Sequence, residues 1–306
     1  MKKILIDTDI GIDCDDAAAL AVAIALEKLG KVCIEGVSTC TAREGASGSV
    51  KAILKHYGLN KDCAAFMGEP LECDKTNVYA KGVKDAFCEK DCEEESVHLL
   101  RRKLAVAEEK VSIIALGPLS VIAGLLESQP DDLSSLNGVE LVKEKVDTLY
   151  TMAGNFVKYH EQLYQGRFTY SSEWNVYQDI KSAQTVANIC PVPIVFCPYE
   201  VGEKVLFGEP FAIDTPVGLS IRMFHQTHKH VLSGENTRSS WDPITVCVAC
   251  GLDLFDFSPY GKITVDDDGF THFEEGKGEH RYIIERLNPE ETAKKINELY
   301  AVICNE

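Results

Sequence analysis

Residues 4–17 join a short apolar run to a cluster of carboxylates, and they are the clearest indication of the fold class. They read Ile4-Leu5-Ile6-Asp7-Thr8-Asp9-Ile10-Gly11-Ile12-Asp13-Cys14-Asp15-Asp16-Ala17. Residues 4–6 have the composition of a buried strand, and the Ala- and Leu-rich run 15–29 has that of a helix. Five aspartates fall within residues 7–16. The segment therefore predicts a strand, a carboxylate-rich loop and a helix, in that order.

The same alternation of short β-rich runs and longer helical runs continues along the chain. It predicts an α/β fold with an open, mainly parallel sheet flanked by helices, and ligands of such sheets bind beyond the carboxyl ends of the strands. An Asp-Gly turn within 263–273 predicts a small C-terminal β-hairpin. The predicted strands are 4–6, 32–38, 64–66, 111–115, 146–152 and 192–197. The predicted helices are 15–29, 44–57, 96–107, 119–127, 178–188, 219–231, 243–250 and 289–302.

Composition and charge exclude several classes of protein. The chain has 306 residues, of which 45% are hydrophobic and 26% charged, as in an ordinary globular protein, and we expect one domain over 1–306. The net charge of -17 makes nucleic acid and anionic membrane surfaces poor partners, since Lys and Arg drive binding to both.

The start of the chain and its cysteines indicate a cytoplasmic protein. Asp7 follows only three apolar residues, which is too soon for the apolar region of a secretory signal. Twelve cysteines among 306 residues fall short of the roughly 8–10% that marks a disulfide scaffold. We expect reduced thiols, including the pair Cys247 and Cys250 on a buried helix.

The carboxylates after the first strand predict a site for a hard cation. Two carboxylates about 4 Å apart repel each other by roughly 4 kcal/mol at an effective dielectric constant of 20, so such a cluster requires a cation, protons or an outward splay. Ligation by oxygen alone favours Ca²⁺ or Mg²⁺ over zinc. Gly11 allows the sharp turn by which Asp9 and the pair Asp15-Asp16 converge. Alternatively, Asp13 or Asp15 caps the helix that begins near Asp16.

The aspartate spacing resembles the N-terminal signature of the nucleoside hydrolase family, in which Asp-x-Asp-x-Gly-x-Asp-Asp-Ala follows the first strand. Here Ile10 stands in place of the commonest proline, and a longer spacing separates Gly11 from the Asp15-Asp16 pair. Further motifs of this chain resemble those of the family in the same order. They are Leu116-Gly117-Pro118-Leu119-Ser120, Met152-Ala153-Gly154-Asn155, Ser172-Glu173-Trp174-Asn175 with Asp179, and Ser240-Trp241-Asp242-Pro243.

The resemblance implies hydrolysis of the N-glycosidic bond of ribonucleosides with Ca²⁺ as the cofactor. The implied calcium ligands are the side chains of Asp9, Asp16 and Asp242 and the backbone carbonyl of Leu116. Asp15 is the implied general base, and the longer loop leaves Asp13 as the alternative. An anionic, metal-loaded floor suits this reaction because its transition state resembles an oxocarbenium ion.

The same resemblance assigns contacts to the sugar. Glu173 and Asn175 resemble the pair that binds the sugar hydroxyls in the family, and Asn155 is a third candidate. Alternatively, Glu173 and Asn175 cap a loop, a position that both residue types favour. We expect Trp174, between them, to pack in the core.

Two departures from the family bear on the leaving base. The family's asparagine after the second strand falls near Arg43, and the histidine before the last aspartate is Trp241 here. The preferred base is therefore open. His225, His228 and His230 are candidate leaving-group acids, although a histidine-rich surface helix accounts for them more simply.

Two other classes of function remain as alternatives. A strand followed by Asp-x-Asp also begins the haloacid-dehalogenase-like phosphatases, but that pattern requires Thr or Val where this chain has Gly11. The changes at Arg43 and Trp241 would also suit a protein that binds nucleosides without cleaving them. The resemblance further implies a homodimer or a homotetramer.

Overall fold

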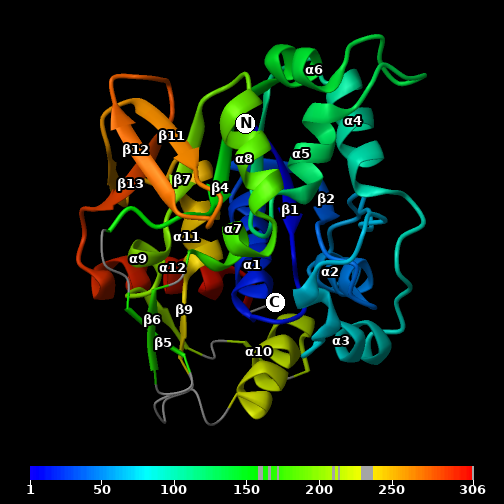
Figure 1. Ribbon diagram of the computed structural model, residues 1–306. Coiled ribbons are helices and arrows are strands. Elements are labelled where there is room, and N and C mark those ends of the chain that lie inside the picture. The colour runs from blue at the N-terminus through cyan, green and yellow to red at the C-terminus, as the bar shows by residue number, and fades with distance from the viewer. Residues whose placement is uncertain are drawn as a thin grey trace.

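A seven-stranded sheet forms the centre of the computed structural model, which describes residues 1–157, 161–164, 167–170, 172–208, 211–212, 214–228 and 237–304. For 161–164 and 167–170 it describes the backbone alone. The strand order is β10-β13-β7-β4-β3-β1-β2, and neighbouring strands run parallel except β10 and β13 (Figure 1). The strands are β1 (Lys2–Thr8), β2 (Val32–Thr39), β3 (Val111–Ala115), β4 (Val146–Met152), β7 (Ile194–Cys197), β10 (Phe255–Phe257) and β13 (Arg281–Glu285).

The sheet is covered on both faces, which is why the middle parts of its inner strands β1, β3 and β7 are mostly apolar. In β1, Ile4 and Ile6 pack into one core and Leu5 into the other, because successive side chains of a strand point to opposite faces. The first core includes α1 (Asp15–Lys28), α2 (Ala46–His56), α10 (Pro216–Thr227), α11 (Trp241–Ala249) and α12 (Pro289–Cys304). The second includes α4 (Ser96–Val106), α5 (Ser120–Glu127), α6 (Gly138–Lys145) and α8 (Ile180–Ile189).

Smaller elements fill the edges of these layers. Three two-stranded antiparallel pairs are β5 (Glu161–Tyr164) with β6 (Arg167–Tyr170), β8 (Leu206–Phe207) with β9 (Arg238–Ser239), and β11 (Gly261–Val265) with β12 (Thr271–Glu275). The remaining helices are α3 (Ala80–Ala86), α7 (Trp174–Gln178), α9 (Tyr199–Gly202) and the 3-10 turn Glu72–Lys75. Among the described residues, no helix has an apolar stretch of the length that a membrane span requires.

The predicted fold class is confirmed. The sheet is mainly parallel, helices flank it, and β11 with β12 forms the expected hairpin. Cys247 lies on the buried helix α11, and all twelve cysteines are free thiols.

The strand predicted at 64–66 is wrong. Ala65 makes only an isolated bridge to Glu95, and Cys63 makes another to Val37, so the segment crosses the edge of β2 without becoming a strand of the sheet. The strands β10 and β13 at the opposite edge were not predicted. Their half-exposed residues lack the continuous apolar character that reveals an inner parallel strand.

The predicted helix 219–231 is shifted. The structure begins α10 at Pro216, where the Thr215 side chain accepts a 3.0 Å hydrogen bond from the Gly218 backbone and proline occupies the first turn. The helix ends at Thr227. His230 lies outside the described residues.

Candidate active site and metal centre

Several of the predicted motifs lie at the carboxyl ends of the central strands. β1, β3 and β4 are neighbours, and all three run in the same direction, so their carboxyl ends meet. Asp9 follows β1, Leu116 follows β3, and Asn155 follows β4. The chain thus places three predicted site residues in adjacent loops, at the edge where parallel sheets bind their ligands.

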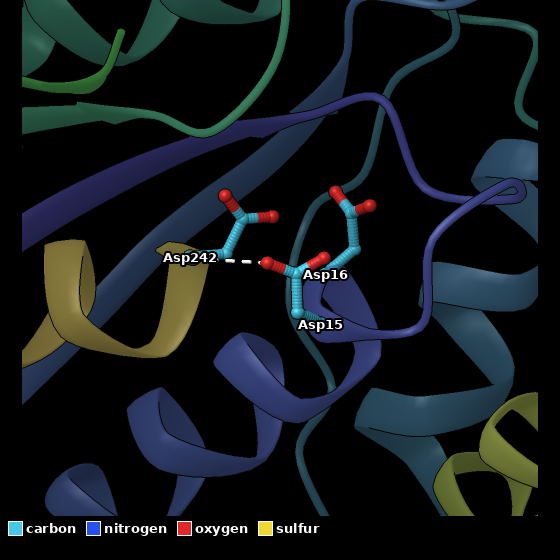
Figure 2. Close-up of side chains that lie close together, drawn as sticks. All are labelled: Asp15, Asp16 and Asp242. Atoms are coloured by element: carbon cyan, nitrogen blue, oxygen red, sulfur yellow. Dashed lines mark hydrogen bonds between the residues drawn. The ribbon is translucent and has the colours of Figure 1, made fainter. Parts of the chain in front are cut away.

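Three buried carboxylates form the centre of the site. Asp15 and Asp16 lie in the first turn of α1, and Asp242 lies in the first turn of α11. Each offers an oxygen atom within 4.8 Å of the others, and each side chain is buried. Figure 2 shows the three carboxylates around one space, with the Asp242 backbone N–H donating a 3.2 Å hydrogen bond to Oδ2 of Asp15.

This group fits a hard cation. Ca²⁺ binds oxygen at about 2.3–2.6 Å, so two of its ligands lie at most about 5 Å apart, and three oxygens within 4.8 Å meet that limit. Burial and then the charges of Asp9 and Asp15 raise the pKa of Asp16 well above its usual value, and burial and then Asp15 do the same for Asp242. Among the described residues, Arg238 forms an ion pair with the neighbouring Asp13, and none forms one with these three carboxylates. A cation would offset this repulsion.

Asp9, a predicted ligand, lies beside these three carboxylates but is not one of the group within 4.8 Å. Its backbone carbonyl accepts a hydrogen bond from the buried Arg43 guanidinium, and Nη1 of Arg43 lies 3.9 Å from Oδ2 of Asp9. Burial raises the pKa of Asp9 to about 6, against the opposing charge of Arg43. Arg43 therefore restrains both the backbone and the side chain of Asp9.

Leu116 and Gly117 lie close to Asp9. A Cβ atom on Gly117 would lie 2.6 Å from Oδ1 of Asp9, so only glycine permits this approach. Nδ2 of Asn175 donates hydrogen bonds to the backbone carbonyls of Leu116, at 2.9 Å, and Met152, at 3.0 Å. A carbonyl oxygen has two lone pairs, so the Leu116 carbonyl can bind both this amide and a cation.

Glu173 is the N-cap residue of the short helix α7. Its carboxylate accepts hydrogen bonds from the backbone N–H groups of Asn175 at 2.8 Å, Val176 at 3.1 Å and Gly154 at 3.1 Å. Burial raises the pKa of Glu173 to about 7 in spite of these bonds. The carboxylate thus joins the loop after β4 to the start of α7.

Asn155 and Trp174 lie on either side of Glu173 in the sequence and have different surroundings. Asn155 holds the C-terminal hairpin: its backbone N–H donates to Oγ1 of Thr271 at 2.9 Å, and its carbonyl accepts from the same hydroxyl at 2.7 Å. The expectation that Trp174 packs in the core is wrong, because half of this residue is exposed. Glu173 and Asn175 both turn inward at the start of the short helix α7, and Trp174 between them faces outward.

The residues predicted on the leaving-group side lie along α10 and the start of α11. Nε1 of Trp241 donates a 3.0 Å hydrogen bond to the carbonyl of Tyr199. His225 is buried on α10. His228 is the C-cap residue that follows α10, and its ring stacks on that of Phe224 with 4.4 Å between centroids. None of these contacts brings a histidine into the three-carboxylate group.

The predicted helix cap at the start of α1 is absent. Cys14 occupies the N-cap position without a side-chain hydrogen bond to the helix, and Asp15 instead accepts the Asp242 N–H. The carboxylate of Asp13 pairs with Arg238, a residue that the sequence did not single out. Thr8, also not singled out, donates its hydroxyl proton to Oδ1 of Asp16. Neither contact has a local sequence signal, since a lone Arg or Thr has no characteristic spacing.

Comparison with known proteins identifies the family of this chain. Residues 4–295 match the sequence profile of the inosine-uridine preferring nucleoside hydrolases. The chain is 24% identical over 240 residues to the non-specific ribonucleoside hydrolase RihC of Klebsiella pneumoniae, covering 76% of this chain and 72% of that protein. It is 24% identical over 266 residues to the pyrimidine-specific ribonucleoside hydrolase RihA of Escherichia coli, covering 82% of this chain and 70% of that protein.

A solved structure agrees with these sequence matches. The purine-preferring ribonucleoside hydrolase from Gardnerella vaginalis superimposes with a TM-score of 0.73 over 100% of both chains at 15% identity, which shows a shared fold. The profile match along residues 4–295 also rules out the phosphatase interpretation. This chain belongs to the inosine-uridine preferring nucleoside hydrolase family and is a hydrolase of N-glycosyl bonds.

Proposed function

We propose that this protein cleaves ribonucleosides to the free base and ribose with a bound Ca²⁺ ion, and that Asp15 is the general base. The observation that carries the proposal is the convergence of three buried carboxylates from the N-termini of α1 and α11. Helix N-termini stabilise negative charge, which helps the fold to keep these groups ionised next to a cation.

Asp16 and Asp242 are the central ligands in this proposal, with Asp9 and the Leu116 carbonyl beside them. The contact of Gly117 with Asp9 supports this arrangement, as does the influence of the Asp9 charge on the pKa values of Asp16 and Asp242. When bound, the cation would hold the sugar hydroxyls and acidify the attacking water.

Asp15 suits the role of base better than Asp13. The carboxylate of Asp13 is engaged by Arg238, which lowers its pKa below the usual range although burial acts in the other direction. Burial, and then the charge of Asp13, raise the pKa of Asp15 well above its usual value. A base with a raised pKa takes a proton from water more readily.

The sugar would contact the loops held by Glu173, Asn175 and Asn155. A carboxylate has about four lone pairs, so Glu173 can accept a bond from a sugar hydroxyl in addition to its three backbone bonds. The cluster of carboxylates also favours the positive charge that develops on the ribose ring in the transition state. Trp241 would border the base, with His225 and His228 as candidate acids on that side.

Several wider predictions go with this function. The names of the relatives span non-specific and pyrimidine-specific ribonucleoside hydrolases, so we extend the substrate class to purine and pyrimidine ribonucleosides. A single domain over 1–306, a homodimer or homotetramer, and a role in base salvage in the cytoplasm remain predictions.

The test is the release of reducing sugar from a panel that includes inosine and uridine, with added Ca²⁺ and with a chelator. We expect ribose release in Ca²⁺ and its loss in the chelator, with recovery when Ca²⁺ is returned. Asp132→Asn, in an exposed loop, is the matched control and should behave as the unmodified protein does. Binding of nucleosides without release of ribose from any of them would favour a binding protein and overturn the proposal.

A further inference from the structure

Asp13 and Arg238 form an ion pair that joins the loop after β1 to the segment before α11. Nε of Arg238 donates hydrogen bonds to both oxygens of the Asp13 carboxylate, at 2.9 Å and 3.0 Å, and Nη2 donates to Oδ2. The side chains are 22% and 27% exposed, so most of each is shielded from water. A bidentate pair of this kind fixes direction as well as distance.

Aromatic rings hold the same guanidinium. Its carbon atom lies 4.7 Å from the centroid of the Trp241 ring and 5.1 Å from that of Phe224, within the range of cation–π contacts. Phe224 belongs to α10 and Trp241 to α11. Side chains of two helices therefore restrain Arg238 independently of its contact with Asp13. Arg238 can in turn restrain the loop after β1.

The position of this pair relative to the carboxylate cluster makes it informative. Asp13 precedes Asp15 by two residues and Arg238 precedes Asp242 by four, and Asp15 accepts the Asp242 N–H at 3.2 Å. The two segments are thus joined by two neighbouring contacts, the Asp13–Arg238 pair and the Asp15–Asp242 hydrogen bond. Without the Asp13–Arg238 pair, the Asp15–Asp242 bond alone would hold the loop against the mutual repulsion of the carboxylates.

The loop between β1 and α1 has features that call for a restraint at Asp13. Asp13 lies within the longer spacing between Gly11 and Asp15, and Gly11 has a φ of +134°, a backbone conformation that only glycine adopts readily. The Tyr79 hydroxyl donates a 2.7 Å hydrogen bond to the Asp13 carbonyl, which restrains the backbone at the same residue. The Asp13 carboxylate accepts the backbone N–H of Cys14 at 2.8 Å and the hydrogen bonds of Arg238.

We propose that Asp13 and Arg238 are a positioning pair, which holds the loop carrying Asp9, Asp15 and Asp16 in register with Asp242 and so preorganises the cation site and the base. The inference rests on the proposed function and adds to it two residues that touch neither substrate nor metal. Residues that orient metal ligands affect metal affinity or activity by about 10–100-fold when they are changed.

The test compares Arg238→Met, Asp13→Asn and the double variant with the unmodified protein. Met keeps the apolar length of the side chain beside Phe224 and Trp241 and removes the charge. We expect each single variant to weaken Ca²⁺ affinity, measured by calorimetry, about tenfold, and to lower kcat at saturating Ca²⁺ by 10–100-fold with a smaller change in KM. Because the two residues act as one unit, the double variant should lose much less than the product of the two single losses. Arg238→Lys, which keeps the charge, should recover part of both.

Arg101→Met is the matched control, because Arg101 is a buried arginine on α4, away from the carboxylate cluster. Its Nε and Nη2 donate hydrogen bonds of 2.7 Å and 2.8 Å to the Asp131 carboxylate. It should lower the melting temperature without changing Ca²⁺ affinity or kcat. If the Asp13 and Arg238 variants behave like Arg101→Met, or if their losses multiply, the positioning pair is refuted while the proposed function stands. If the unmodified protein neither binds Ca²⁺ nor releases ribose, the proposed function fails first and this inference fails with it.

Discussion

The backbone N–H of Asp242 donates a hydrogen bond to Oδ2 of Asp15, 3.2 Å away, although 227 positions separate the two residues in the sequence. The bond joins the first turn of α11 to the first turn of α1, and it accounts for the side-by-side placement of the carboxylates that these turns carry. In our proposal the Asp15 carboxylate also accepts a proton from the attacking water.

Asp15→Asn should separate the role of base from that of ligand. An asparagine has nearly the same size and can still accept the Asp242 N–H through its side-chain oxygen, but it cannot take a proton from water. We expect kcat for ribose release to fall by about 10²–10⁴-fold, with Ca²⁺ affinity changed by less than about threefold. Unchanged turnover would remove Asp15 from the mechanism, and a large loss of Ca²⁺ affinity would make it a ligand instead.

Asp242→Asn should have opposite effects on the metal-free and metal-loaded protein. Removing one of three buried charges relieves repulsion, so without metal the variant should be more stable by about 1–3 kcal/mol at pH 8. Its Ca²⁺ affinity should fall by at least about 100-fold, because a charged ligand is lost. Urea unfolding in chelator and calorimetry with Ca²⁺ measure the two effects. A variant that is less stable without metal and binds Ca²⁺ normally would contradict the assignment.

The metal-free protein should lose stability as the pH rises. Burial raises the pKa values of Asp7 and Glu173 to about 7 from ordinary values of 3.8 and 4.5. Between these limits the folded state binds more protons than the unfolded state, so the free energy of unfolding falls with increasing pH. Asp15, Asp16 and Asp242 contribute with the same sign.

Urea unfolding in chelator from pH 5 to pH 8 measures this dependence. Glu173 alone would contribute about 3 kcal/mol of the loss, at roughly 1.4 kcal/mol for each unit of pKa shift. Glu173→Gln should flatten the profile by about that amount, since glutamine does not titrate. A stability that rises over this range would show that the buried acids are ionised in the metal-free protein.

Arg43→Met should destabilise the protein by about 2–4 kcal/mol. The Arg43 guanidinium is buried and donates to the backbone carbonyls of Asp9, Thr76 and Cys73, so its loss leaves these acceptors and the Asp9 carboxylate without their partner. Arg286→Met is the control, since Arg286 pairs with an exposed Asp253 and should change the free energy of unfolding far less than Arg43→Met does. Equal unfolding free energies for the two variants would contradict the structural role of Arg43.

Much of the fold could be predicted because it depends on local patterns. The apolar run at Ile4 to Ile6 and the carboxylates after it indicate an inner parallel strand and its carboxyl end, and the structure confirms this strand at the centre of the sheet. The edge strand β13 has no such signal, since its residues are half exposed and its place beside β7 depends on a contact far along the chain.

The site divides in the same way. The Asp15-Asp16 pair and Asp242 stand in recognisable motifs, and the structure brings their carboxylates together. The partners that fix the surrounding loop, Arg238 and Arg43, are single residues remote in sequence from what they contact, so only the fold reveals them. Trp174 was misjudged for a related reason: its exposure depends on the inward turn of its neighbours in α7, which composition does not reveal.

The most direct test of the account is a crystal structure of the protein grown in Ca²⁺, with the ion identified by its anomalous scattering. We expect one ion bound by oxygens of Asp16 and Asp242 at about 2.3–2.6 Å, with Asp9 and the Leu116 carbonyl completing the protein's share of the ligands. Asp16 and Asp242 turned apart, with no ion between them, would contradict the central claim.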